Sequence, residues 1–132
     1  MKLERLTNRK GQSLVETALV LPVILLILTG IVDFGLLFNN YMMVSNASRE
    51  GARTAAIGST DEKIRTVVNT VAASLDTSKL TVTISPDQMV GRTSGDAVAV
   101  TVEYEYKMIT PVIAAIIPGP FQLKTSTTMR CE

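Results

Sequence analysis

The most prominent pattern in the chain is one long apolar run near its N-terminus. Residues 14–38 are apolar almost throughout. The run is interrupted only by Glu16, Thr17, Thr29 and Asp33. A helix of this length would measure about 37 Å, whereas the hydrocarbon core of a bilayer is about 30 Å thick. The pattern therefore predicts a helix that crosses a membrane.

The helical pattern continues beyond the apolar run and reaches Gly58, a residue suited to a C-terminal helix cap. We therefore expect one N-terminal helix over residues 12–57, with a transmembrane part at about 14–38 and a projecting part at 39–57. On the projecting part, small residues recur every four positions in two adjacent rows. These rows are Ala47, Gly51 and Ala55, and Ser48, Ala52 and Ala56. Small residues let another backbone approach closely, so the face is either an ordinary packing face or one that packs on copies of the chain or on partner helices.

The opposite side of the projecting part is charged. Arg49, Glu50 and Arg53 fall there. Glu50 and Arg53 are spaced to form an exposed ion pair, which would contribute only a few tenths of a kcal/mol. We expect this segment to act through close packing at Gly51 and to have no catalytic role.

The second half of the chain predicts a small α+β head over residues 58–132. Ser59 or Thr60, followed by two acids, is a good start for a second helix. Its apolar stripe recurs at spacings of three and four and comprises Ile64, Val67, Val68, Val71, Ala72 and Leu75. Apolar and polar residues then alternate in three segments, which predicts strands at residues 80–85, 98–108 and 121–131. We expect one helix on a three-stranded antiparallel sheet, with the projecting helix completing an otherwise small core.

An apolar segment, residues 111–120, separates the last two predicted strands. Prolines bound it, and it is too short to span a membrane. It either covers one side of the sheet or forms an exposed patch that meets a partner subunit.

Composition and charge exclude several functions. Thirteen basic and twelve acidic residues give a net charge of +1, which argues against a broad nucleic-acid-binding face. The chain has no histidine and one cysteine, Cys131, which excludes His-based catalysis, His-containing metal sites and internal disulfides. The acids of the head are scattered, and nothing pairs them for acid–base chemistry. We therefore expect a protein that is not an enzyme, with no metal, no cofactor, no small-molecule substrate and a free Cys131 thiol.

Residues 1–11 form a basic leader. Four basic residues oppose the single acid Glu4. A positive flank predicts that the N-terminus stays in the cytoplasm and that the head lies outside. A cleaved secretory signal begins similarly, but this apolar run is too long for a usual signal and no A-x-A cleavage site follows it. We therefore expect a signal-anchor helix that stays in the membrane, not a conventional cleaved secretory signal.

Three residues at the mouth of the apolar helix form a motif. Gly11 and Gln12 follow a basic residue, and Glu16 comes five residues after the glycine. This arrangement resembles the processing site of type IV prepilins. The resemblance implies that a prepilin peptidase cuts after Gly11, that Gln12 becomes the new N-terminus, and that Glu16 pairs with the terminal amine of a neighbouring subunit. A structural alternative is a capping box, because Ser13-x-x-Glu16 fits its pattern without any cleavage.

The resemblance extends to the TadE-like pseudopilins of tight-adherence (Tad) pilus systems. Its further elements are a D-x-G step at Asp33 and an A-x-R-E-G-A-R-x-A-A segment over residues 47–56. Thr17 departs from the family pattern, because an aromatic residue often follows the glutamate. The resemblance implies a minor pilin or pseudopilin of the bacterial inner membrane that acts in pilus biogenesis and adhesion. Its implied partners are prepilin peptidase, other pilin subunits, Tad inner-membrane assembly proteins and membrane lipid.

Two alternatives stay open. Asp33, in the apolar helix, either reaches the outer lipid headgroups or contacts a partner membrane helix. The chain as a whole could also be an unprocessed single-pass membrane protein whose head binds a ligand or an envelope component.

Overall fold

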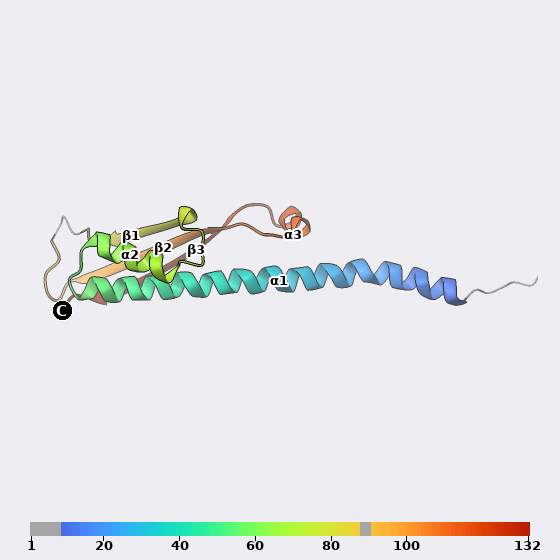
Figure 1. Ribbon diagram of the computed structural model, residues 1–132, viewed down its shortest axis with the longest axis horizontal. Coiled ribbons are helices and arrows are strands. Elements are labelled where there is room, and N and C mark those ends of the chain that lie inside the picture. The colour runs from blue at the N-terminus through green and yellow to red at the C-terminus, as the bar shows by residue number, and fades with distance from the viewer. Residues whose placement is uncertain (1–8, 88–90) are drawn as a thin grey trace, which may run out of the picture.

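The computed structural model describes residues 9–87 and 91–132. A single helix, α1 (Arg9–Ala56), runs along the whole molecule and continues through Pro22 (Figure 1). Its 48 residues correspond to about 72 Å of helix. The expected long N-terminal helix is confirmed, whereas residues 1–8 of the predicted leader lie outside the described residues.

The start of α1 corrects one prediction. Because the helix already includes Arg9, Ser13 is an interior residue and is not the N-cap. The Ser13 carbonyl instead accepts a hydrogen bond from the Thr17 hydroxyl at 2.9 Å. The capping-box alternative for Ser13 and Glu16 is therefore wrong.

The second predicted helix is present as α2 (Asp61–Val71). The Thr60 side chain caps it by accepting a hydrogen bond from the backbone N–H of Lys63. Ile64 and Val68 of the predicted stripe are buried. A short 3₁₀ turn, η1 (Thr77–Lys79), then leads into the sheet.

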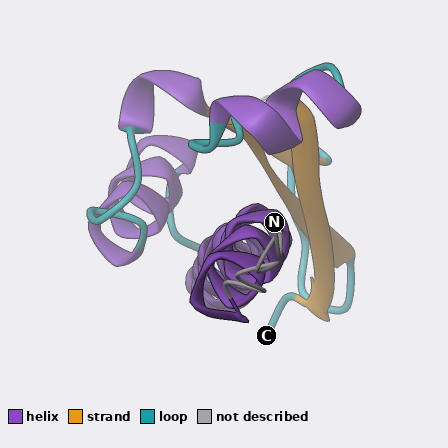
Figure 2. Cartoon of the chain, turned by 90° about the vertical axis from the view of Figure 1, so that its right-hand side faces the viewer, coloured by secondary structure: helices purple, strands orange, loops and turns teal. Residues whose placement is uncertain are grey.

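The sheet has three antiparallel strands in the order β1-β2-β3, as predicted. The strands are β1 (Leu80–Ser85), β2 (Ala97–Tyr106) and β3 (Phe121–Arg130). Alternate residues of β2 are buried, because successive side chains of a strand point to opposite faces. In the view along α1, the helix lies beside the sheet (Figure 2).

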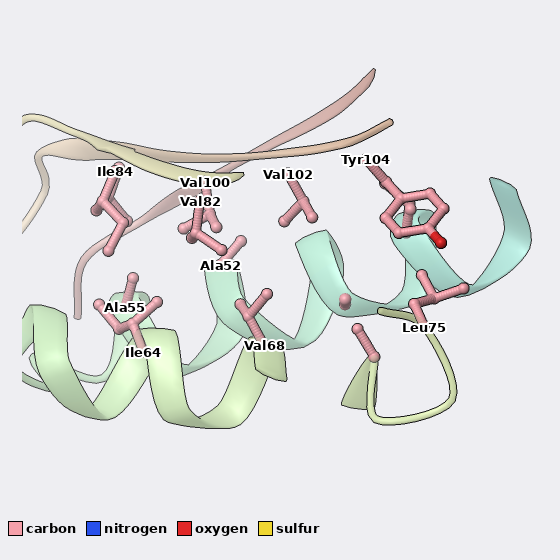
Figure 3. Packing of buried hydrophobic residues seen from close by; sticks show 14 of the residues in the cluster. Ala52, Ala55, Ile64, Val68, Leu75, Val82, Ile84, Val100, Val102 and Tyr104 are labelled. Carbon is pink, nitrogen blue, oxygen red and sulfur yellow. The ribbon is translucent and has the colours of Figure 1, made fainter. Parts of the chain in front are cut away.

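The core lies between the inner face of the sheet and two helices, α2 and the last part of α1 (Figure 3). The strands contribute branched aliphatic and aromatic side chains, and α1 contributes Val44 and several alanines. Ala47, Ala52 and Ala55 of α1 are fully buried there. The expected α+β head is confirmed, with the projecting helix as part of its core.

The segment between β2 and β3 differs from its main prediction. Its residues form a short helix, α3 (Pro111–Ile116), which lies beyond the end of the sheet and beside the middle of α1 (Figure 1). None of the residues of α3 is buried. The prediction that residues 111–120 cover one side of the sheet is therefore wrong, and the segment is an exposed apolar patch.

Candidate functional site

The predicted assembly motif lies on the first turns of α1. Gly11 and Gln12 are both helical, and the Glu16 side chain is exposed one turn further along. Glu16 borders a shallow depression of about 220 Å³ whose other walls are Ser13, Thr17, Val20, Leu21 and Ile24. The Glu16 carboxylate therefore faces outward, next to apolar side chains.

The exposure of the Glu16 carboxylate carries an energetic cost in a membrane, and α1 is long and apolar enough to cross one. Among the side chains that the structure describes, none pairs with the Glu16 carboxylate. An unpaired carboxylate inside an apolar helix costs about 3 kcal/mol in a membrane. The geometry thus leaves Glu16 available to a cation from another molecule.

The Gly11–Gln12 peptide bond lies in helical backbone. A protease cleft binds extended chain, so cleavage at this bond requires the helix end to unwind. Glycine lowers the cost of unwinding, because it is about 1 kcal/mol less favourable than alanine in a helix. It also carries no side chain that would hinder close approach of a protease.

Asp33 occupies an environment that neither prediction described. Its side chain is only 2% exposed, and Oδ2 accepts a hydrogen bond from the backbone N–H of Thr110 at 3.3 Å. Thr110 is the N-cap residue of α3. Asp33 therefore has a hydrogen-bond partner within its own chain, which neither alternative included, and the contacts with lipid headgroups or with a partner membrane helix stay predictions.

Tyr106 lies near the same carboxylate. Burial of the Tyr106 phenol raises its pKa above 10.0, and the negative charge of Asp33 raises it further. Its hydroxyl is buried and has no hydrogen-bond partner among the described residues. Tyr106 lies in the strand predicted at residues 98–108, but no sequence signal pointed to Asp33 as its neighbour.

The small-residue face of α1 packs within the chain. A Cβ atom added at Gly51 would lie 2.7 Å from Val68 Cγ2 and 3.1 Å from Val100 Cγ1. Ala47, Ala52 and Ala55 are fully buried beside it. The face is thus an ordinary packing face, and the alternative of copies or partner helices is wrong because α2 and the sheet cover it.

Ser48 has a role that the sequence did not reveal. This buried side chain donates a hydrogen bond to the carbonyl of Val100 at 2.8 Å. Its Oγ also lies 2.9 Å from the hydroxyl of Thr127, which can donate to it. Ser48 therefore ties α1 to both β2 and β3. A hydroxyl within a row of alanines and a glycine was the available signal.

The charged side of the same helix forms no ion pair between Glu50 and Arg53. Both side chains are exposed, and the ion pairs among the described residues lie elsewhere in the head. In one of them Arg92 binds Asp61 and also donates to the carbonyl of Pro86. The predicted Glu50–Arg53 pair is therefore wrong, and this face of α1 is left to solvent or partners.

The described residues contain no group of three His, Cys, Asp or Glu side chains placed to hold a metal ion. Cys131 directly follows β3 and carries a buried free thiol. The candidate sites in the described part of the chain are the exposed surfaces of α1 and the contacts that α1 makes with other elements.

A comparison with known protein families matches the part of the chain that carries the assembly motif. Residues 11–53 match the model of a family described as TadE-like protein. The match begins at Gly11 and ends within the last turn of α1, so it covers the helix and leaves α2, α3 and the sheet unmatched. The resemblance drawn from the motif is confirmed over this segment. Comparisons with the curated proteins and with the solved structures gave no match.

Proposed function

We propose, from the TadE-like match over residues 11–53, that the chain is a membrane-anchored pilin-like component of a Tad-type pilus assembly apparatus. The observation that carries the proposal is the position of Glu16. It is an exposed acid near the start of a long apolar helix, within the matched segment. The TadE-like family is structural and non-enzymatic, in agreement with a chain whose acids are scattered.

Membrane anchoring is supported by the surface of α1. One stretch of the helix is long and apolar enough to cross a membrane by length and composition. Its large apolar side chains are exposed along the helix from Leu14 to Phe38. Apolar surface left in water costs roughly 25 cal/mol per Å², so this surface is suited to lipid. We place the N-terminus in the cytoplasm and the head outside the inner membrane, because the leader is basic.

Processing by a prepilin peptidase is the second part of the proposal. Cleavage after Gly11 would remove four basic residues and one acid, a charge of +3, and leave a mature chain of net charge −2 from the original +1. Glu16 would then pair with the N-terminal amine of a neighbouring processed subunit, and in a copy of this chain that amine would belong to Gln12. Such pairing would fix the axial register of the subunits and remove the cost of an unpaired carboxylate.

The remaining partners follow from this assignment. They are other pilin or pseudopilin subunits, Tad inner-membrane assembly proteins and membrane lipid. The helix side that carries Arg49, Glu50 and Arg53 is exposed and accessible to them. We propose a minor subunit that supports pilus biogenesis and, through the pilus, adhesion.

A complementation experiment tests the assignment. Cells that lack this chain are supplied with the wild type, with Glu16→Gln, or with Glu105→Gln as a matched control, and surface pili are counted. Glu105 is exposed like Glu16 but lies on β2 of the head, so its variant is expected to restore pili. Glu16→Gln should reach the membrane yet lower the pilus count at least tenfold. Normal pili in cells lacking the chain would overturn the proposed function, and normal pili with Glu16→Gln would overturn the amine pairing.

A further inference from the structure

The assembly role proposed above does not account for the exposed apolar patch around α3. Between Lys107 and Lys124 the sequence contains no charged residue. Four large apolar side chains there are exposed: Ile109, Val112, Ile116 and Ile117. Contiguous exposed apolar surface of this kind marks contact with a partner or a membrane.

The position of α3 indicates which of these it meets. The helix lies beside the middle of α1, well away from the head's core (Figure 1). Ile113 Cδ1 lies 3.5 Å from the place that a Cβ on Gly30 would take. Between the two helices lies an apolar groove of about 350 Å³ lined by Pro22, Leu25, Leu26, Thr29, Thr110 and Val112. The exposed face of α3 is thus continuous with the exposed apolar face of α1.

The depth of this contact can be estimated from the helix rise. If the hydrocarbon core begins near Leu14, its thickness of about 30 Å takes up about 20 residues and ends near Asp33. Gly30, beside Ile113, then lies about 24 Å along the helix from Leu14, still within the hydrocarbon. The neighbouring α3 would therefore stand at the level of the outer leaflet.

Several backbone groups of the segment are hydrogen-bonded or lack an N–H, which lowers its cost in lipid, where each unpaired N–H or C=O group is costly. Helical hydrogen bonds join Ala114 to Thr110 and Ile117 to Ile113. The N–H of Thr110 is taken up by Asp33. Prolines at 111, 118 and 120 have no N–H to satisfy. The same hydrogen bond shields the Asp33 carboxylate, which is almost fully buried.

We propose that residues 109–117 form a wedge that enters the outer leaflet beside α1, with the acyl chains of phospholipids as its occupant. The wedge gives the head a second membrane contact and fixes the rotation of the head about α1. This inference rests on the membrane anchoring within the proposed function, and the following experiment separates the two.

Tryptophan fluorescence provides the test, because the chain contains no tryptophan. Three variants of the full chain each carry one: Ile116→Trp on the wedge, Ile27→Trp on the apolar part of α1, and Ile57→Trp at the end of the head. Ile57 is the matched control for Ile116, since the two side chains are 66% and 65% exposed. Each protein is reconstituted in phosphatidylethanolamine and phosphatidylglycerol vesicles whose acyl chains carry bromine, a contact quencher. We expect roughly a twofold loss of fluorescence for Ile116→Trp and Ile27→Trp, as for side chains in the acyl region, and none for Ile57→Trp.

Other results would overturn the proposal in distinguishable ways. Quenching of Ile27→Trp without Ile116→Trp would leave the anchor intact and refute the wedge. Shielding of Ile116→Trp from both bromine and aqueous iodide would assign the patch to a second copy of the chain. No quenching of either variant would refute the anchor together with the wedge. Val112→Trp, on the same exposed surface, repeats the test if Ile116→Trp changes the circular dichroism spectrum, and must be quenched as well.

Discussion

The Asp33 carboxylate accepts a hydrogen bond from the backbone N–H of Thr110, a residue 77 positions further along the chain. The bond joins the apolar helix α1 to the first residue of the α3 region. It also gives a buried acid within an apolar helix a partner that belongs to the same molecule. The hydrogen bond therefore tethers the start of α3 to α1.

Replacing Asp33 with leucine should release α3. The Thr110 N–H would then be left without its acceptor, and an unsatisfied buried donor costs about 1–3 kcal/mol. We expect faster hydrogen exchange at the Thr110 amide in Asp33→Leu, measured on the full chain in detergent micelles. Asp33→Asn is the control, because its side-chain carbonyl can still accept and should retain the protection. Equal protection in the leucine variant and the wild type would contradict this role for Asp33.

A side chain at Gly51 should destabilise the head. The added Cβ of Gly51→Ala would lie 2.7 Å from Val68 Cγ2, a stiff branched side chain. Overpacking of this kind costs about 1–3 kcal/mol. Chemical unfolding of the full chain in micelles should show that loss, and Val68→Ala should recover part of it in the double variant. Gly35→Ala is the matched control, since nothing lies within 4 Å of its Cβ. A Gly51→Ala variant as stable as the wild type would refute the close approach.

Removing the Ser48 hydroxyl should weaken the attachment of α1 to the sheet. In Ser48→Ala the Val100 carbonyl loses this hydrogen bond, which we expect to lower the free energy of unfolding by about 1 kcal/mol. Ser45→Ala, on a half-buried side chain of the same helix, serves as the comparison in the same denaturant titration. If both alanine variants unfold at the same denaturant concentration, the hydrogen bond contributes nothing measurable.

Acid should destabilise the turn before β2. Hydrogen bonds from the Thr93 hydroxyl and from its backbone N–H hold the pKa of Asp96 below its ordinary value of 3.8. A carboxyl whose pKa is lower in the folded state stabilises the fold above its unfolded pKa, and this contribution is lost as the pH falls through the folded pKa. Asp96→Asn should therefore flatten the decline in stability below about pH 4, measured by thermal unfolding. An unchanged acid limb in that variant would show that the turn does not contribute.

The parts of the fold that were predictable are those encoded by local periodicity. The apolar run marks α1, and Thr60 with the acids after it marks the start of α2. Alternation over residues 98–108 marks a strand whose inner residues are buried. These signals depend on residues that are close together in the sequence, so they can be recognised without knowledge of the tertiary structure.

The parts that were not predictable depend on contacts distant in sequence or on small energies. The site of α3 is set by the lengths of β2 and β3 and by Asp33, which no local pattern connects to Thr110. The small-residue rows indicated close packing, but only the fold shows that α2 and β2 supply the partners. An exposed pair such as Glu50 and Arg53 contributes a few tenths of a kcal/mol, too little for its spacing to ensure that it forms.

The N-terminus of the protein in cells tests the central claim most directly. The chain is extracted from membranes of cells with and without an active prepilin peptidase, and its N-terminal peptide is identified by mass spectrometry. A pilin-like subunit should begin at Gln12 in the first cells and retain Met1 in the second. A chain that retains Met1 in both would contradict the account and would favour an unprocessed membrane protein with a binding head.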